Sequence, residues 1–119
     1  MTDSLFTRLG GVEGITAITS DLVDNHLANK TINTRFANAS VAALKDGAAK
    51  FVIAGTGGPN EYQGKDMLAT HKGMNISAEE FMAVMDDALA ALISNGIGQR
   101  EQEEMLYILY SMRADVVRV

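Results

Sequence analysis

His71 is one of only two histidines in the chain, and it follows a segment whose residues cannot continue a helix. Glycines at 57 and 58 and the sole proline, at 59, stop the preceding apolar segment and force a turn. Gly64 interrupts the chain again, so that residues 65–72 can form a helix of about two turns. A helix of that length is marginal by itself and needs tertiary packing. The functional question is what this segment and its histidine hold.

The imidazole of His71 would share one helix face with Met67 and Leu68, which lie four and three positions before it. That face must be covered by something apolar, and a polar ring on it needs a partner. In one interpretation His71 is structural, and a backbone carbonyl or water satisfies its ring. In the other it is a metal or haem ligand, with Nε2 on the iron and Nδ1–H donating to the carbonyl one turn back, near Met67. The spacing alone does not decide between them.

A metal site built from protein ligands alone is disfavoured around His71. No second histidine lies three or four positions away, and the chain contains no cysteine. A porphyrin supplies four nitrogens of its own and needs only one ligand from the protein.

The rest of the chain shows helical periodicity and no persistent period of two. Ser40 is a good N-cap, and Ser77 with Glu80 forms a capping box. Residues 29–38 form a polar connection held by apolar anchors that include Phe36. The apolar spacing predicts an all-α protein with helices over residues 4–9, 12–28, 41–54, 77–95 and 101–117.

Four parts of the chain carry a more specific pattern. They are residues 4–11 (SLFTRLGG), Phe36, the segment from Gly57 to His71, and residues 112–117 (MRADVV). Together they resemble the truncated haemoglobins, specifically group I, and the similarity extends over essentially the whole chain. The resemblance implies a globin-like two-over-two helical sandwich in a single domain over residues 1–119. It also makes His71 the proximal ligand of a haem iron, with haem b (iron protoporphyrin IX) as the cofactor.

Aligned with the truncated haemoglobins, the chain has three residues on the distal side of the haem, which is the side opposite His71. All three depart from the family pattern. Val23 stands where relatives usually have a tyrosine, Leu44 faces the iron from the distal helix, and Ala48 stands where a glutamine is common. A hydrogen-bond donor stabilises bound dioxygen in a low-dielectric pocket. We therefore expect fast dioxygen release, quick autoxidation and a bias toward carbon monoxide and nitric oxide, or toward anions and sulfide in the ferric state.

The resemblance further implies which residues contact the cofactor. Phe36 would stack on the haem face, and the small Val52 would leave an apolar ligand channel more open. Lysines near helix ends are candidates for the propionates, although such lysines are often only solvated. The haem-lining residues would be Phe36, Phe51, Val52, Met67, Leu68, Ile76, Phe81, Val84 and Met112, and the lysines are Lys45, Lys65 and Lys72.

Two other polar side chains have competing interpretations. His26 lies three residues after Val23, so it is a conceivable sixth ligand or donor, but a surface or inter-helix position is favoured. Tyr62 lies in the turn before the histidine helix, where its expected role is to anchor that turn through its hydroxyl.

Composition narrows the possible partners. The formal net charge of −5 disfavours binding to nucleic acid or to anionic membranes. No segment approaches the length of apolar sequence that a membrane span needs, and the N-terminus lacks a signal-peptide pattern. The absence of cysteine fits a reducing compartment. We expect a cytoplasmic protein, monomeric rather than oligomeric.

Three functions are consistent with the sequence. The first is a haem protein that reversibly binds diatomic gases (dioxygen, carbon monoxide, nitric oxide) for transport, storage or scavenging. The second is a haem enzyme, a nitric oxide dioxygenase or a peroxidase-like protein, which would need an external reductase and polar distal residues. The third is a haem-free helical interaction module with a structural His71. Whether the protein is an enzyme is left open by the sequence.

Overall fold

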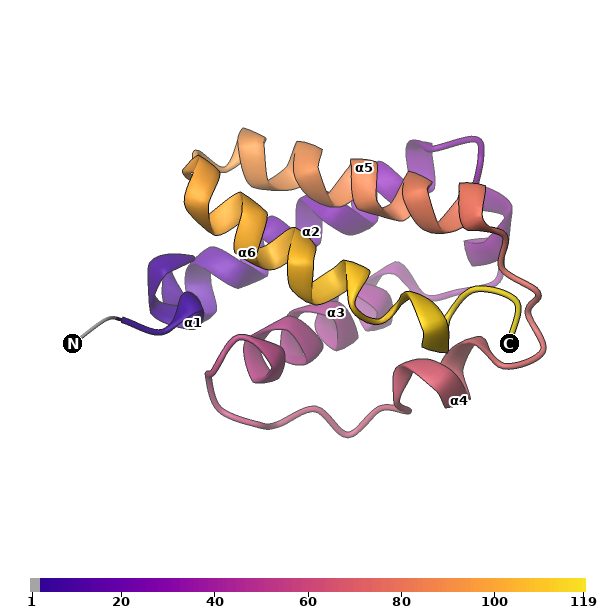
Figure 1. Ribbon diagram of the computed structural model, residues 1–119, viewed down its shortest axis with the longest axis horizontal. Helices are drawn as coiled ribbons and strands as arrows, with labels where there is room; N and C mark the ends of the chain where they lie inside the picture. Colours follow the sequence, from indigo (N-terminus) through magenta and orange to yellow (C-terminus); the bar gives the residue numbers. More distant parts are fainter. Residues whose placement is uncertain (1–2) are drawn as a thin grey trace.

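The computed structural model describes residues 3–119, so Met1 and Thr2 of the predicted 1–119 domain lie outside it (Figure 1). Within that range the chain forms six α-helices and two short 3-10 helices and no strand, which confirms the all-α prediction. No helix in the described range is long and apolar enough to cross a membrane. In chain order the elements are α1 Leu5–Arg8, α2 Gly11–Ala28, η1 Asn33–Phe36, α3 Val41–Gly55, α4 Met67–His71, α5 Ala78–Ser94, α6 Gln99–Tyr110 and η2 Arg113–Asp115.

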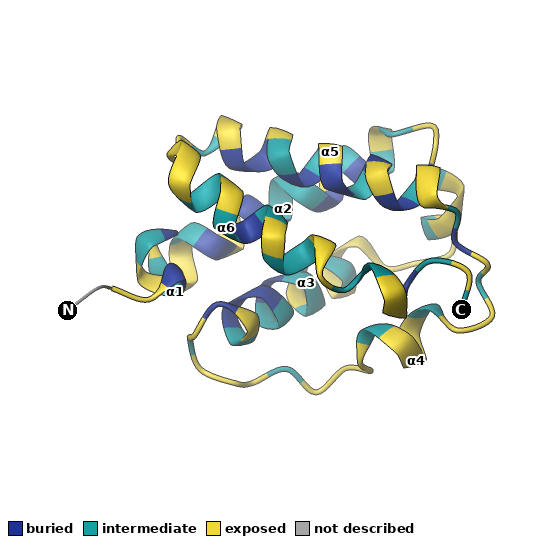
Figure 2. Ribbon diagram, viewed as in Figure 1, coloured by how far each residue is buried: buried dark blue, intermediate teal, exposed yellow. Residues whose placement is uncertain are grey.

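The four long helices form two pairs. Helix α2 packs against α3 and also against α5, and α5 packs against α6 (Figure 1). Each long helix turns its buried residues toward the others and its exposed residues outward (Figure 2). The connection between α3 and α4 runs along the outside of the molecule, and most of it is exposed (Figure 2).

Helix α1 packs against the end of α3 at Gly57 and Gly58. The Phe6 N–H donates to the Thr56 carbonyl at 2.9 Å. A Cβ on Gly58 would come within 2.6 Å of the Phe6 ring and 2.8 Å of Ile53. Gly57 has a φ of +104°, a conformation that favours glycine. The diglycine therefore ends α3 and also makes room for α1.

The interior contains two apolar clusters. The larger one joins α1, α2, α3, α5 and α6 through Leu5, Leu9, Ile15, Ile18, Val52, Ile53, Ala91, Leu92 and Met105. The second cluster consists of Ile76, Phe81, Met85 and Val116, and Met67, Met74, Leu106, Leu109 and Val117 pack against it. The second cluster lies beside the short helix that carries His71.

The last helix and the helix that carries His71 differ most from their predicted bounds. Helix α6 ends at Tyr110, not at Val117, because the chain tightens into η2 and then buries Val116 in the second cluster. Val117 forms an isolated parallel β-bridge with Ile76. This tertiary contact outweighs the local preference for a continuous helix. Helix α4 begins at Met67 because the Asp66 side chain caps it, accepting from the Ala69 N–H at 2.7 Å.

The predicted helix caps at Ser40 and Ser77 are confirmed. The Ser40 hydroxyl accepts from the Ala43 N–H at 3.3 Å. Ser77 and Glu80 form the capping box, in which each side chain accepts from the other residue's backbone N–H. The connection over residues 29–38 contains η1, which includes Phe36.

Candidate functional site

His71 is the last residue of α4, and its ring is oriented by its own helix. Its Nδ1 lies 2.8 Å from the carbonyl oxygen of Met67, as the sequence predicted. A carbonyl can only accept, so Nδ1 carries a proton, and in the neutral ring Nε2 carries the lone pair. The side chain is half-buried. This is the tautomer in which an imidazole binds a metal through Nε2.

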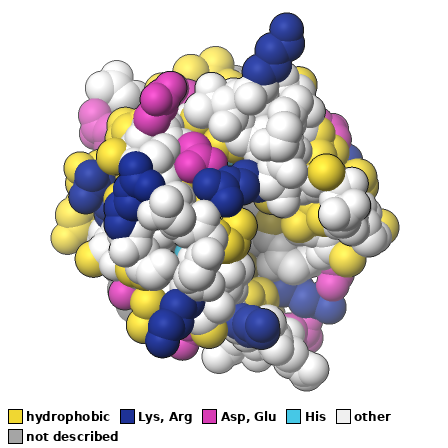
Figure 3. Space-filling view, turned by 90° about the vertical axis from the view of Figure 1, so that its right-hand side faces the viewer, with side chains coloured by type: hydrophobic (Ala, Val, Ile, Leu, Met, Phe, Trp, Pro, Cys, Tyr) yellow, Lys and Arg dark blue, Asp and Glu magenta, His cyan; other side chains and the backbone are white. Residues whose placement is uncertain are grey.

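Apolar residues lie close to this histidine along the chain. Met67 and Met74 are half-buried and pack against the second cluster. Leu68, in the same helix, is 46 % exposed. Figure 3 shows this end of the molecule, with a hollow near its centre, hydrophobic side chains at the rim, and Lys, Arg, Asp and Glu side chains around it. A hollow with an apolar rim suits an apolar group.

The three residues predicted for the distal side lie on the paired helices α2 and α3. Val23 is buried on α2, and Leu44 and Ala48 are half-buried on α3. Their side chains contain only carbon and hydrogen, so none of them can donate a hydrogen bond.

The residues predicted to line the cofactor come from several elements of this architecture. Val52, Ile76 and Phe81 are buried, whereas Phe36, Phe51, Val84 and Met112 are half-buried. Phe36 belongs to η1, and its ring stacks on His26 with the ring centroids 5.7 Å apart and the planes 6° apart. The sequence did not predict this stacking.

His26 is the inter-helix histidine that the sequence favoured. Its Nδ1 lies 2.7 Å from Oδ2 of Asp87, and the residue is only 9 % exposed. The Asn29 amide also donates to both Asp87 carboxylate oxygens, at 3.1 and 3.2 Å. Together these bonds join α2 to α5. No sequence signal identified Asp87, because it lies 61 residues from its partner.

Tyr62 anchors the turn before α4, as predicted. Its hydroxyl donates to the Lys65 carbonyl at 2.6 Å. Its ring meets Phe51 edge to face, with centroids 5.2 Å apart. Of the three lysines considered for propionates, Lys45 pairs with Asp24 at 2.9 Å, and Lys65 and Lys72 are exposed near α4.

Comparison with known proteins places these features in a family. A model of the bacterial-like globin family matches residues 4–118. The chain belongs to this family. The globin is similar to a group 1 truncated haemoglobin of Tetrahymena thermophila, with 28% identity over 94% of this chain and 93% of the relative.

Solved structures agree with that assignment. The Fe(III) form of the truncated haemoglobin from Tetrahymena pyriformis is 26% identical, with a TM-score of 0.94 over 98% of this globin and 100% of that chain. A group II truncated haemoglobin from Bacillus anthracis shares the fold, with a TM-score of 0.89 at 18% identity. The predicted resemblance to truncated haemoglobins and the globin-like two-over-two sandwich are confirmed.

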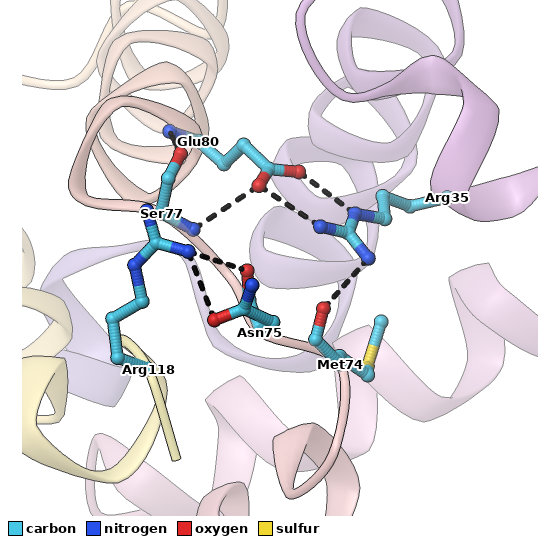
Figure 4. A network of polar contacts seen from close by, with 6 residues as sticks. All are labelled: Arg35, Met74, Asn75, Ser77, Glu80 and Arg118. Carbon is cyan, nitrogen blue, oxygen red and sulfur yellow. Dashed lines mark hydrogen bonds and ion pairs between the residues drawn. The ribbon is translucent and has the colours of Figure 1, made fainter.

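A polar network lies next to the His71 segment of this globin, and the sequence did not predict it (Figure 4). It contains Arg35, Glu80 and Arg118. The Arg35 guanidinium, together with the Ser77 backbone N–H, lowers the pKa of the Glu80 carboxyl to about 2. No local pattern could reveal the pairing, since Arg35 and Glu80 are 45 residues apart.

Two surface depressions of the globin do not involve His71. One lies between α1 and α6, where Glu104 raises the pKa of Arg8 through a side-chain hydrogen bond, and the other lies between α2 and α3. The first depression is lined by Leu5, Arg8, Arg100, Glu103, Glu104, Tyr107 and Ile108, and the second by Val12, Thr16, Ser20, Lys45, Asp46, Ala49, Lys50, Ile53, Pro59 and Glu61.

Residues 3–119 contain no group of three or more His, Cys, Asp or Glu side chains placed to hold a metal ion.

Proposed function

We propose that this globin holds a haem through a bond from His71 to the iron and uses it to bind diatomic gases reversibly. Membership of the globin family supports haem-based binding of gaseous ligands. The residue assignment rests on this family match together with the Met67–His71 hydrogen bond, because that bond alone would also satisfy a structural histidine. The bond fixes the imidazole in the tautomer whose Nε2 is free to bind iron, on a face that is otherwise apolar.

The donor set fits haem better than a bare metal ion. One histidine is sufficient when the porphyrin supplies the other four nitrogens. The half-buried Phe36, Met67 and Met74 and the exposed Leu68 provide an apolar surface for the macrocycle. Lys65 and Lys72 are exposed near the histidine helix and are the proposed partners of the propionates. We propose haem b because the chain has no cysteine for thioether attachment.

The distal residues determine which gas is favoured. Haem held by His71 would supply an iron that binds the gas. We place Val23, Leu44 and Ala48 beside the bound gas, where they exclude water and offer no donor to it. Dioxygen gains more from such a donor than carbon monoxide or nitric oxide does. The proposed pocket therefore binds dioxygen weakly and releases it quickly.

The enzyme alternative finds less support. A nitric oxide dioxygenase or a peroxidase-like protein needs a reductase, and bond cleavage needs polar groups near the ligand. The three distal side chains proposed here are apolar. We further propose that the protein works as a single-domain monomer in the cytoplasm, which its net charge of −5 and its lack of cysteine support.

Absorption spectra test the proposal directly. The purified protein, reconstituted with haem, is measured in the ferric state, in the ferrous state and in the ferrous state with carbon monoxide. We expect a Soret band that shifts when carbon monoxide is added. A protein that takes up no haem would support the helical interaction module instead.

A His71→Gly variant tests the ligand itself. Because glycine leaves a space in place of the ring, we expect the variant to lose the wild-type ferrous spectrum and to regain it when free imidazole is added. A His26→Gln variant is the matched control, and we expect its spectrum to equal that of the wild type. An unchanged spectrum in His71→Gly would overturn the proposal. An altered spin state of the iron in His26→Gln would show that His26 takes part in binding it.

A further inference from the structure

The helix that carries His71 is too short to fix its own position. Helix α4 has five residues, fewer than an isolated helix needs for stability. The element that it packs against most is η2, near the C-terminus. Upstream of α4 the chain is a mostly exposed connection, anchored by the Tyr62 hydroxyl on the Lys65 carbonyl. The position of the imidazole depends also on the residues that follow it, the segment 73–76.

The last residues of the chain bind this segment along its backbone. The Gly73 N–H donates to the Val119 carbonyl at 3.0 Å, and the Arg118 N–H donates to the Ile76 carbonyl at 2.9 Å. The Arg118 guanidinium also donates to the Asn75 side-chain carbonyl at 2.8 Å (Figure 4). Residues 116–119 thus lie alongside the segment from its first residue to its last.

The contact between Arg118 and Asn75 also involves unusual backbone conformations. Among the non-glycine residues that the structure describes, only Asn75 and Arg118 have positive φ, +52° and +57°. An arginine in this conformation is uncommon and unfavourable by itself. Strain of this kind persists when the surrounding contacts determine the conformation. The two strained residues are hydrogen-bonded to each other, so these contacts hold both of them.

On its other side the segment is bound by Arg35. This guanidinium donates to the Met74 carbonyl at 2.9 Å, three residues after His71. It also forms a two-bond pair with the Glu80 carboxylate, at 2.7 and 2.9 Å, and Glu80 is fixed by the capping box of α5 (Figure 4). A planar guanidinium in such a pair has a well-defined orientation. Arg35 is the neighbour of Phe36, so η1 carries both a proposed haem-lining residue and a contact to the segment after His71.

We propose that Arg118 and Arg35 are positioning residues for the His71 imidazole. They hold the segment 73–76 from two sides, and this segment fixes the end of α4 and with it the direction of Nε2. The inference rests on the proposed function, because the bond that it concerns is the one between His71 and iron. It adds that the strength of this bond is set by the C-terminal residues 116–119 and by η1, not by α4 alone.

The test compares Arg118→Ala with Arg118→Lys and Arg100→Ala. Lysine keeps one donor for Asn75, and Arg100 is an exposed arginine of α6 that pairs with Glu104 of the same helix. In haem-free protein, we expect Arg118→Ala to raise the amide hydrogen exchange rate of Gly73 by about tenfold, the factor expected for one lost hydrogen bond. Arg118→Lys and Arg100→Ala should leave that rate near the wild-type value.

Reconstituted protein gives the second readout. We expect Arg118→Ala to shift the iron–histidine stretching band of the ferrous protein in resonance Raman spectra and to speed haem loss about tenfold. Arg118→Lys should restore both. A variant that merely unfolds more easily would lose haem without shifting the band of the folded fraction, and that result would overturn the inference.

The outcomes separate the inference from the proposed function. If His71→Gly abolishes the wild-type spectrum while Arg118→Ala leaves the stretching band and haem loss unchanged, only the positioning role is refuted. If His71→Gly leaves the spectrum unchanged, the iron ligand is elsewhere and both proposals are refuted.

Discussion

Single residues set the chemistry of the proposed site. His71 supplies one nitrogen, and its tautomer is fixed by a carbonyl of its own helix, at Met67. The opposite side is assigned to Val23, Leu44 and Ala48, none of which can donate a hydrogen bond. A hydrogen bond to a charged acceptor contributes about 1.5–3 kcal/mol, so a single hydroxyl would change the properties of this pocket.

Introducing that hydroxyl is the sharpest test at the scale of one residue. We expect Val23→Tyr to release dioxygen about 10- to 100-fold more slowly than Val23→Phe, since the two variants differ only in a hydroxyl. Stopped-flow measurement of dioxygen release from the reconstituted ferrous protein gives the rates. Equal rates in the two variants would mean that position 23 does not face the ligand, and slow release from the wild type would reveal a donor elsewhere.

At the scale of elements, the glycine pairs determine how helices end and where the next one packs. Gly58 lets the Phe6 ring of α1 lie directly against the chain as it leaves α3. Without this close approach, α1 could not complete the larger apolar cluster through Leu5 and Leu9. The same turn begins the long connection to α4.

A methyl group at this position should separate the two elements. We expect Gly58→Ala to lower the free energy of unfolding by about 1–3 kcal/mol, because its Cβ would overlap Phe6 and Ile53. Gly55→Ala is the control, since a Cβ there meets nothing within 4 Å, and it should be neutral or stabilising by up to about 1 kcal/mol. Urea unfolding of both variants measures the difference, and equal midpoints would show that α1 can move aside.

At the scale of the whole molecule, a few long-range polar contacts join parts that are distant along the chain. Asp87 connects α5 to α2 through His26 and Asn29. Arg35 connects η1 to α5 and to the segment after His71. These contacts lie at the same end of the fold as the second apolar cluster, where the cofactor is proposed to bind.

The Arg35–Glu80 pair should make global stability depend on pH in the acid range. The pKa of Glu80 in the folded protein is about 2, below its ordinary value of 4.5. The folded state therefore binds fewer protons than the unfolded state between these values, so the pair stabilises the fold above pH 4.5 and loses this effect as the pH falls toward 2.

A Glu80→Gln variant isolates this contribution. Both partners are partly exposed, so we expect the variant to be less stable than the wild type by about 1–2 kcal/mol at pH 6 and the difference to shrink at pH 3. Thermal or urea unfolding at the two pH values measures it, and Glu79→Gln, an exposed neighbour, is the control. A difference that does not change with pH would show that the lost contribution is packing and not charge.

The sequence by itself determined the features that depend on neighbours within one helical turn. These include the helices, the caps at Ser40 and Ser77, and the orientation of the His71 ring by Met67. Such contacts join positions three or four residues apart, so periodicity and residue type reveal them. The family resemblance added the overall arrangement, which the structural comparisons confirmed.

Only the tertiary structure decided which distant residues meet. It ended α6 at Tyr110, paired Arg35 with Glu80 and placed His26 between Asp87 and Phe36. It also brought Arg118 to the segment that follows His71. Apart from the stacking of His26 on Phe36, these contacts join residues 43 to 61 positions apart or depend on burying Val116. Their free energy exists only after the helices have packed. No pattern along the chain predicts that packing, because polar residues of these types usually lie on the surface.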